Sequence, residues 1–285
     1  MPDLVQAIEE ALALHRQGRL DEAERIYGRV LKSMPDQFDA LHLGAMLKLQ
    51  RGRAAEAYRL ISAALARLDG VSEVVARGDR LPPFDVQCPV ASLPLAFKTT
   101  LATIPAAVPY LAADAGHLAR WRSRLEPIRP PRVAIAWAGR PTHPNDRNRS
   151  VTLAELDPLL STPDVAFVSV QRDLPAADAE RVRREQRITH VGDELRDFSD
   201  TGAVVALADL VVAVDTAVVH LAGALGRPTW ILLPFAADWR WQLDRDDSPW
   251  YPSARLFRQA ALGDWRGVMA RVSTELAKIG RSRQG

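Results

Sequence analysis

The residues with the clearest chemical use are Asp215, Thr216 and His220. Asp215 follows an apolar run over residues 210–214 that predicts a strand, and Thr216 opens a predicted helix over residues 216–225. The free amide hydrogens in the first turn of such a helix favour an anion. Thr216 adds a hydroxyl donor, and His220 lies one turn further along the same face. The stretch predicts an anion site; the alternative for an isolated Asp-Thr pair is a helix cap beside a structural histidine.

A second candidate group lies in the loop after another apolar run. Residues 133–137 predict a buried parallel strand that ends at Trp137, and Gly139 begins the loop. The arginines of this loop are Arg140, Arg147 and Arg149. Guanidinium groups bind phosphate oxygens through oriented hydrogen bonds. Each arginine alone would be interpreted as part of a solvated loop, but a cluster at the carboxyl end of a strand favours anion binding.

The dense aromatic group Trp239, Trp241, Trp250 and Tyr251 has two interpretations. It could wall a cleft against a sugar or an acceptor, but such groups more often pack in a core or between domains.

Other chemistries lack support in the sequence. No G-x-G-x-x-G pattern follows a predicted strand, which disfavours a dinucleotide oxidoreductase. Cys88 is the only cysteine, and no His, Cys and Asp residues stand at metal-ligand spacing, so we predict neither a disulfide nor a metal site.

The elements that position these residues alternate between strand and helix. The predicted strands cover residues 133–137, 165–170, 188–191, 210–214, 229–233 and 255–258, and the predicted helices 153–160, 175–186, 198–208, 216–225 and 264–279. This alternation predicts an α/β fold with a Rossmann-like, doubly wound parallel sheet. Ligands bind beyond the carboxyl ends of such strands. That rule selects residues 137–149, Gln171, Asp193 and residues 215–220.

The N-terminal part repeats with a period of 34 residues, so that Gly18 recurs as Gly52 and Ala23 as Ala57. The period is typical of tetratricopeptide repeats, each of two antiparallel helices. Residues 1–70 therefore predict two helix pairs, which would bind a protein partner, mediate self-association or serve as a structural extension.

Residues 71–130 are interrupted by prolines. We expect short strands at residues 71–76 and 84–89 and a helix at 115–125, which amounts to part of a second α/β domain. Residues 131–285 would form the complete one.

Several separate stretches, in the right order, resemble the heptosyltransferases of glycosyltransferase family 9 and, more closely, bacterial tetratricopeptide-repeat relatives of the O-linked N-acetylglucosamine transferases. The matching stretches are residues 137–139, 145–150, 169–171, 197–201, 208–210, 215–228, 233–241 and 248–251.

The resemblance implies a GT-B fold whose C-terminal domain binds a nucleotide-diphosphate sugar as substrate, without a cofactor or metal. The Asp215-Thr216 turn and His220 would then contact the phosphates and the sugar. Arg147 or Arg149 would neutralise the leaving diphosphate, and Gln171 would contact the base. In that family the N-terminal domain begins with a glycine-rich turn and supplies the catalytic base. We find no such turn here, so the acceptor domain is expected to be truncated and no catalytic residue is assigned.

The bulk composition is that of an ordinary globular protein. The net charge of the 285-residue chain is +2, which gives no argument for nucleic acid as a partner. The longest apolar stretch, residues 203–214, is too short to span a bilayer, and the N-terminus lacks signal-peptide character, so we expect a cytoplasmic location. Two functions follow: a glycosyltransferase acting on a saccharide or protein acceptor, or a non-catalytic interaction protein with a degenerate transferase domain.

Overall fold

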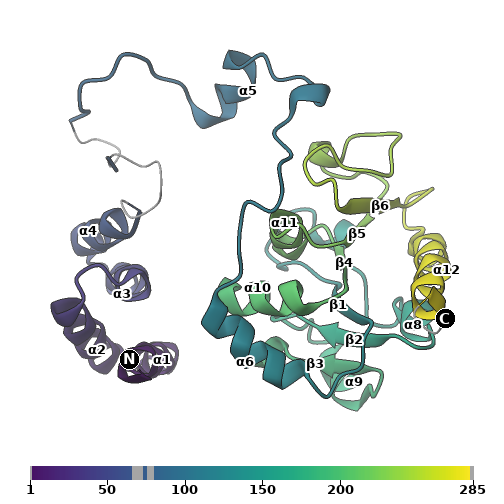
Figure 1. Cartoon of the computed structure of the whole chain (residues 1–285), viewed down its shortest axis with the longest axis horizontal. Helices are drawn as coiled ribbons and strands as arrows, with labels where there is room; N and C mark the ends of the chain where they lie inside the picture. Colours follow the sequence, from purple (N-terminus) through teal and green to yellow (C-terminus); the bar gives the residue numbers. More distant parts are fainter. Residues whose placement is uncertain (1, 66–72, 76–79, 283–285) are drawn as a thin grey trace. The chain divides into compact units, whose positions relative to one another are not determined.

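The computed structural model describes residues 2–65, 73–75 and 80–282 (Figure 1). The chain divides into two compact units, Met1–Cys88 and Pro89–Gly285. Each unit is described separately below.

The first unit is a set of antiparallel helices. They are α1 (Pro2–Arg16), α2 (Leu20–Ser33), α3 (Phe38–Gln50) and α4 (Ala54–Leu65). Gly18 and Gly52 take positive φ angles of 76° and 72° in the two equivalent turns, a conformation that favours glycine. Ala23 is fully buried, so its small side chain lets neighbouring helices approach closely. The predicted pair of tetratricopeptide units is confirmed.

Polar contacts also follow the repeat. After the first glycine turn Arg19 pairs with Glu22, and at the same place in the second unit Arg53 pairs with Glu56. Both pairs lie near the surface and therefore contribute little stability. The apolar core around Ile26, Tyr27 and Leu47 holds the helices together.

The second unit is built on one parallel sheet. Its strands are β1 (Arg132–Ala136), β2 (Ala166–Ser169), β3 (Ile188–His190), β4 (Leu210–Val214), β5 (Thr229–Leu233) and β6 (Ala254–Arg258). They pair in the order β3-β2-β1-β4-β5-β6, every pair parallel. This is the Rossmann order, so the predicted fold class is confirmed.

Helices cover both faces of the sheet. They are α6 (Ala115–Leu125), α8 (Asp157–Leu160), α9 (Ala179–Arg184), α10 (Phe198–Leu207), α11 (Ala217–Ala224) and α12 (Trp265–Ser282). Two short helices, α5 (Leu93–Ala96) and α7 (Asp146–Arg149), bury no residue and do not join these layers. Figure 1 shows α10 and α11 on one face and α12 on the other. Successive side chains of a strand point to opposite faces. Val133 and Ile135 of β1 accordingly join the core under α12, whereas Ala134 and Ala136 join the core under α10.

Some expected elements differ. Residues 84–89 form no strand, because Phe84 and Val86 are exposed and pair with no neighbouring strand among the described residues. Of the strand expected at 71–76, residues 73–75 are irregular and the others lie outside the described residues. The helix expected at 153–160 is regular only from Asp157 onward. The short helix α7 lies in the arginine loop, where none was expected. Among the described helices, none has both the length and the apolar character needed to cross a membrane.

Candidate functional site

The strand order reverses between β1 and β4, and this reversal marks the carboxyl edge where ligands bind in open α/β sheets. The chain leaves β1 towards Gly139 and leaves β4 at Asp215. Both of the motifs that the sequence singled out therefore begin at the same crevice, although they are far apart along the chain.

Arg149 joins the two motifs. Its Nη1 donates to the backbone carbonyl of Asp215 at 2.8 Å, and only 15% of its side chain is exposed. The guanidinium lies so close to Gly139 that a Cβ atom at that position would collide with it. Gly139 is therefore needed for close approach, and Arg149 places a positive charge at the reversal point.

The arginine loop is held in place by local polar contacts. The backbone N–H of Gly139 donates to Ser150 Oγ at 2.9 Å, and Ser150 Oγ donates to Asp146 Oδ1 at 3.0 Å. Asp146 also faces Arg149, with Arg149 Nε 3.4 Å from Asp146 Oδ1. Arg140 and Arg147 are exposed in the same loop. Arg149 is thus fixed by the fold, whereas the two other cations are solvent-facing at the rim.

Helix α11 begins at the crevice without a side-chain cap. Thr216 is its N-cap residue in an extended conformation, but its hydroxyl accepts no hydrogen bond from the first turn. Thr216 Oγ1 is buried and has no partner among the described residues. Ala217, the first helical residue, is exposed. The Val219 N–H donates to the Thr216 carbonyl at 3.1 Å, and among the described residues no side chain accepts from the other amide groups of the first turn.

His220 lies one turn into α11 and faces three groups. Its Nδ1 is 3.1 Å from the hydroxyl of Tyr251, its Nε2 is 3.9 Å from Asp215 Oδ1, and its ring stacks on Trp241 with centroids 5.4 Å apart. Burial lowers the pKa of His220 below its usual 6.5, and the nearby Asp215 carboxylate opposes this only in part. The neutral form of the imidazole is therefore favoured at pH 7.

A pocket of about 170 Å³ opens beside His220. Its aromatic lining consists of Tyr110, Trp239, Trp241, Trp250 and Tyr251, and Arg240 completes it. The packing interpretation is confirmed for Trp241, and the role of the pocket against a sugar or an acceptor stays a prediction. Trp241 is fully buried in the core, whereas 70% of Trp239 is exposed at the mouth. Tyr110 was not predicted, because it comes from the irregular segment before the sheet.

Trp137 and Gln171 support the crevice from below. Trp137 is fully buried and donates from Nε1 to Asp178 at 2.8 Å. The amide of Gln171 accepts from the N–H groups of Trp137 and Ala138 and donates to the carbonyls of Ala138 and Asp173. All four hydrogen-bonding positions of this side-chain amide are occupied. Its geometry is that of a brace for the end of β1.

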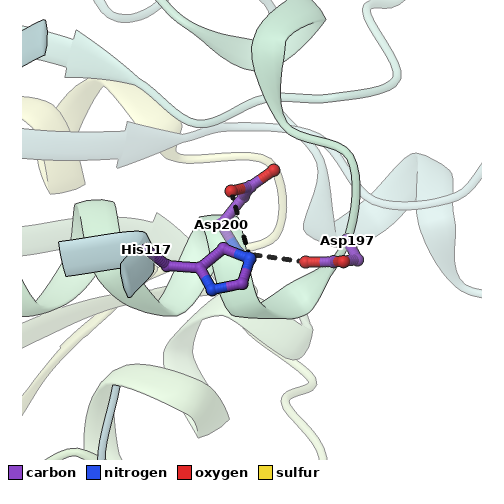
Figure 2. Close-up of side chains that lie close together, drawn as sticks. All are labelled: His117, Asp197 and Asp200. Atoms are coloured by element: carbon purple, nitrogen blue, oxygen red, sulfur yellow. Dashed lines mark hydrogen bonds and ion pairs between the residues drawn. The ribbon is translucent and has the colours of Figure 1, made fainter. Parts of the chain in front are cut away.

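A separate polar cluster lies between α6 and α10. Figure 2 shows His117 and Asp197 beside Asp200, and their potential ligand atoms lie within 4.8 Å of one another. Asp200 is fully buried and accepts from Trp121 Nε1 and the N–H of Arg196, both at 2.9 Å, and from Arg120. Asp197 caps α10 by accepting from Ser199 and Asp200 N–H groups. The carboxylates are engaged in joining two helices.

Comparison with known proteins finds a family model that matches each part of the chain. Residues 14–76 match the tetratricopeptide repeat model, and residues 154–234 match glycosyltransferase family 9 (heptosyltransferase). Protein FlbA of Caulobacter vibrioides is 28% identical over 204 residues, covering 70% of this chain and 34% of FlbA. The chain thus spans about a third of the length of that curated relative.

Two solved structures are similar at low identity. ADP-heptose LPS heptosyltransferase II of E. coli is 14% identical with a TM-score of 0.45, over 92% of this chain and 81% of that chain. A mutant O-GlcNAc transferase of Thermobaculum terrenum is 18% identical with a TM-score of 0.32, over 91% of this chain and 58% of that chain.

The family match covers Asp215, Thr216 and His220, but it begins after Arg149 and ends before Trp239. The chain therefore combines a segment that matches the tetratricopeptide repeat model with a segment that matches the glycosyltransferase family 9 model.

Proposed function

We propose that the α/β unit binds a nucleoside-diphosphate sugar at the crevice between β1 and β4 and transfers the sugar to a saccharide or protein acceptor. The observation that carries the proposal is the position of Arg149, which lies between Gly139 and the Asp215 carbonyl at the strand-order reversal. A positive charge, an uncapped helix start and a glycine that permits close approach together suit a diphosphate.

In this proposal the diphosphate lies at the start of α11, against the first-turn N–H groups. Arg149 supplies a fixed cation, and Arg140 and Arg147 add charge from the rim. In glycosyl transfer the bond between the anomeric carbon and the phosphate oxygen breaks, and the diphosphate leaves with an added negative charge. Oriented guanidinium and amide donors stabilise that charge without a metal ion. The Asp215 carboxylate is proposed to accept hydrogen bonds from hydroxyl groups of the ligand. The imidazole of His220 is proposed to accept or donate one.

Trp137 and Gln171 belong to the proposed site as positioning residues. They fix the end of β1, from which the arginine loop leaves. We therefore propose no contact of Gln171 with the base.

The alternative is a protein that binds the nucleotide but transfers nothing. It is favoured by residues 80–114, which contain short helices and irregular chain and no strand, so they build no second sheet opposite the crevice. The repeats would then serve a protein partner.

The test is a binding panel of UDP, ADP and GDP and their hexose conjugates, measured by thermal shift and calorimetry. At least one ligand should raise the melting temperature, because it binds only the folded state. Arg149→Met and Arg147→Met should each weaken that ligand roughly tenfold, the loss of one charged hydrogen bond. Arg255→Met is the matched control, because Arg255 pairs with Glu275 away from the crevice.

If no ligand binds, or if both crevice variants bind like the wild type, the proposal fails. If binding is normal but neither hydrolysis nor transfer of the sugar is detected, the non-catalytic alternative stands.

A further inference from the structure

The aromatic pocket beside His220 has a use that the proposed diphosphate site does not explain. Its volume is about 170 Å³. Pockets for whole drug-sized ligands measure roughly 300–1,000 Å³. This pocket therefore accommodates one ring-sized group, not an entire nucleotide.

The walls of the pocket combine flat apolar surfaces with hydroxyl-compatible polar groups. Trp239 and Trp250 meet edge to face, with ring centroids 6.2 Å apart. The polar groups are the His220 imidazole, the Tyr251 hydroxyl and the Arg240 guanidinium, which lies 5.2 Å from the Trp239 ring centroid. A sugar ring has apolar C–H faces and a rim of hydroxyl groups, so it matches both kinds of surface.

One wall comes from outside the sheet. The N–H groups of Tyr110 and Leu111 both donate to the carbonyl of Ala224, at 3.0 and 3.2 Å, near the end of α11. Pro109 lies against Gly226. Tyr110 lies beside Tyr251, whose pKa is raised mainly by burial and also by the interaction with Tyr110. We name residues 109–111 the strap; it presents Tyr110 to the pocket.

The distance of the pocket from the start of α11 indicates which ring of a nucleoside-diphosphate sugar it would hold. His220 is one helical turn, about 5.4 Å, from the start of α11, and its Nε2 lies 3.9 Å from Asp215. In a nucleoside-diphosphate sugar, the sugar is bonded directly to a phosphate, whereas a ribose separates the base from the other phosphate. A diphosphate at the start of α11 therefore places the sugar within reach of the pocket.

We infer that this pocket is the subsite for the transferred sugar ring and that Tyr110 of the strap is one of its specificity-determining residues. The inference rests on the proposed function. Besides His220, it assigns recognition of the sugar to residues outside the family match, which ends at residue 234.

The experiment compares a nucleoside diphosphate with its own hexose conjugate. Calorimetry is performed on the full chain with UDP and UDP-glucose, ADP and ADP-glucose, and GDP and GDP-mannose. The variants are Trp239→Ala, Tyr110→Ala and Tyr110→Phe. Trp239 and Tyr110 are 70% and 61% exposed, so these variants should fold, which circular dichroism checks. Phe97→Ala is the control, because Phe97 is an exposed aromatic residue outside the pocket.

For the conjugate that binds the wild type, Trp239→Ala and Tyr110→Ala should each raise its Kd roughly tenfold and leave the Kd of the free diphosphate unchanged. Tyr110→Phe should have an intermediate effect, since it removes only the hydroxyl. Equal losses for both ligands would place the base or ribose in the pocket, and no loss for either would leave it without a role; each result overturns the inference. Failure of the wild type to bind any ligand would instead refute the proposed function.

Discussion

At the scale of single residues, Gly139 and Arg149 form one device. The glycine leaves the space that the guanidinium occupies, and the guanidinium reaches the carbonyl at the end of the neighbouring strand. The role of each residue is apparent only from its contact with the other. Together they link the ends of β1 and β4.

Replacement of Gly139 by alanine tests this device. The added Cβ meets the ends of the Arg149 and Asp146 side chains, which can move aside, so we expect a folded protein destabilised by about 1 kcal/mol. Nucleotide affinity should fall roughly tenfold, because Arg149 loses its position. Gly28→Ala is the control: Gly28 lies in α2 with open space around its Cβ position, so stability should rise by up to about 1 kcal/mol with unchanged affinity. Unchanged nucleotide affinity in Gly139→Ala would show that Gly139 is not needed to position Arg149.

The environment of His220 predicts a dependence of stability on pH. Burial lowers its pKa in the folded state below 6.5, so the unfolded chain binds the proton more readily. The contribution of His220 to the free energy of unfolding is therefore complete above pH 6.5 and is lost as the pH falls below that value. Urea unfolding at pH 7.5, 6.5 and 5.5 should show a smaller loss for His220→Gln than for the wild type. Parallel losses would assign the pH dependence to other groups.

At the scale of elements, the sequence predicted the strands well, because buried parallel strands are continuous apolar runs. It failed at residues 84–89, where apolar and polar residues alternate but Phe84 and Val86 are exposed and no described strand pairs with them. The contact of Arg149 with Asp215 could not be predicted, since it links residues 66 positions apart through the strand order. Tyr110 was missed because the strap has neither helical nor strand periodicity.

The joint between α6 and α10 depends on one buried carboxylate. Asp200 of α10 accepts from Arg120 and Trp121 of α6 and from the backbone N–H of Arg196, so Asp200→Ala leaves several donors unsatisfied. We expect a loss of about 3 kcal/mol in the free energy of unfolding. Asp197→Ala removes the cap of α10 and the surface contact with His117, and should cost about 1 kcal/mol. Equal losses in urea unfolding would show that Asp200 acts only as part of the helix start.

At the scale of the whole molecule, every residue of the candidate site lies in the second unit, and this unit begins near Pro89. Its core includes Trp121 and Leu125 of α6, which precede the first strand. The functional domain therefore extends further towards the N-terminus than the boundary at residue 131 that the strand pattern suggests.

Truncation tests that boundary. Residues 89–285 should fold alone and bind nucleotide with the affinity of the full chain. Residues 131–285 lack α6 and the strap. This fragment should melt at a lower temperature or aggregate, because it lacks the buried Trp121 and Leu125 side chains that complete the core. Calorimetric melting and the nucleotide panel on both fragments provide the measurement. A stable, fully binding shorter fragment would refute this boundary.

The pairing of β1 with β4 also has a consequence in time. The two strands are adjacent in the sheet but start about eighty residues apart in the chain. At a ribosomal rate of roughly 5–20 residues per second, several seconds pass between the synthesis of β1 and that of β4, the strand with which it pairs. During that interval the nascent chain contains the arginine loop but not the Asp215 carbonyl to which Arg149 donates. If the proposed function holds, the chain binds a nucleotide only after the second half of the sheet has been made.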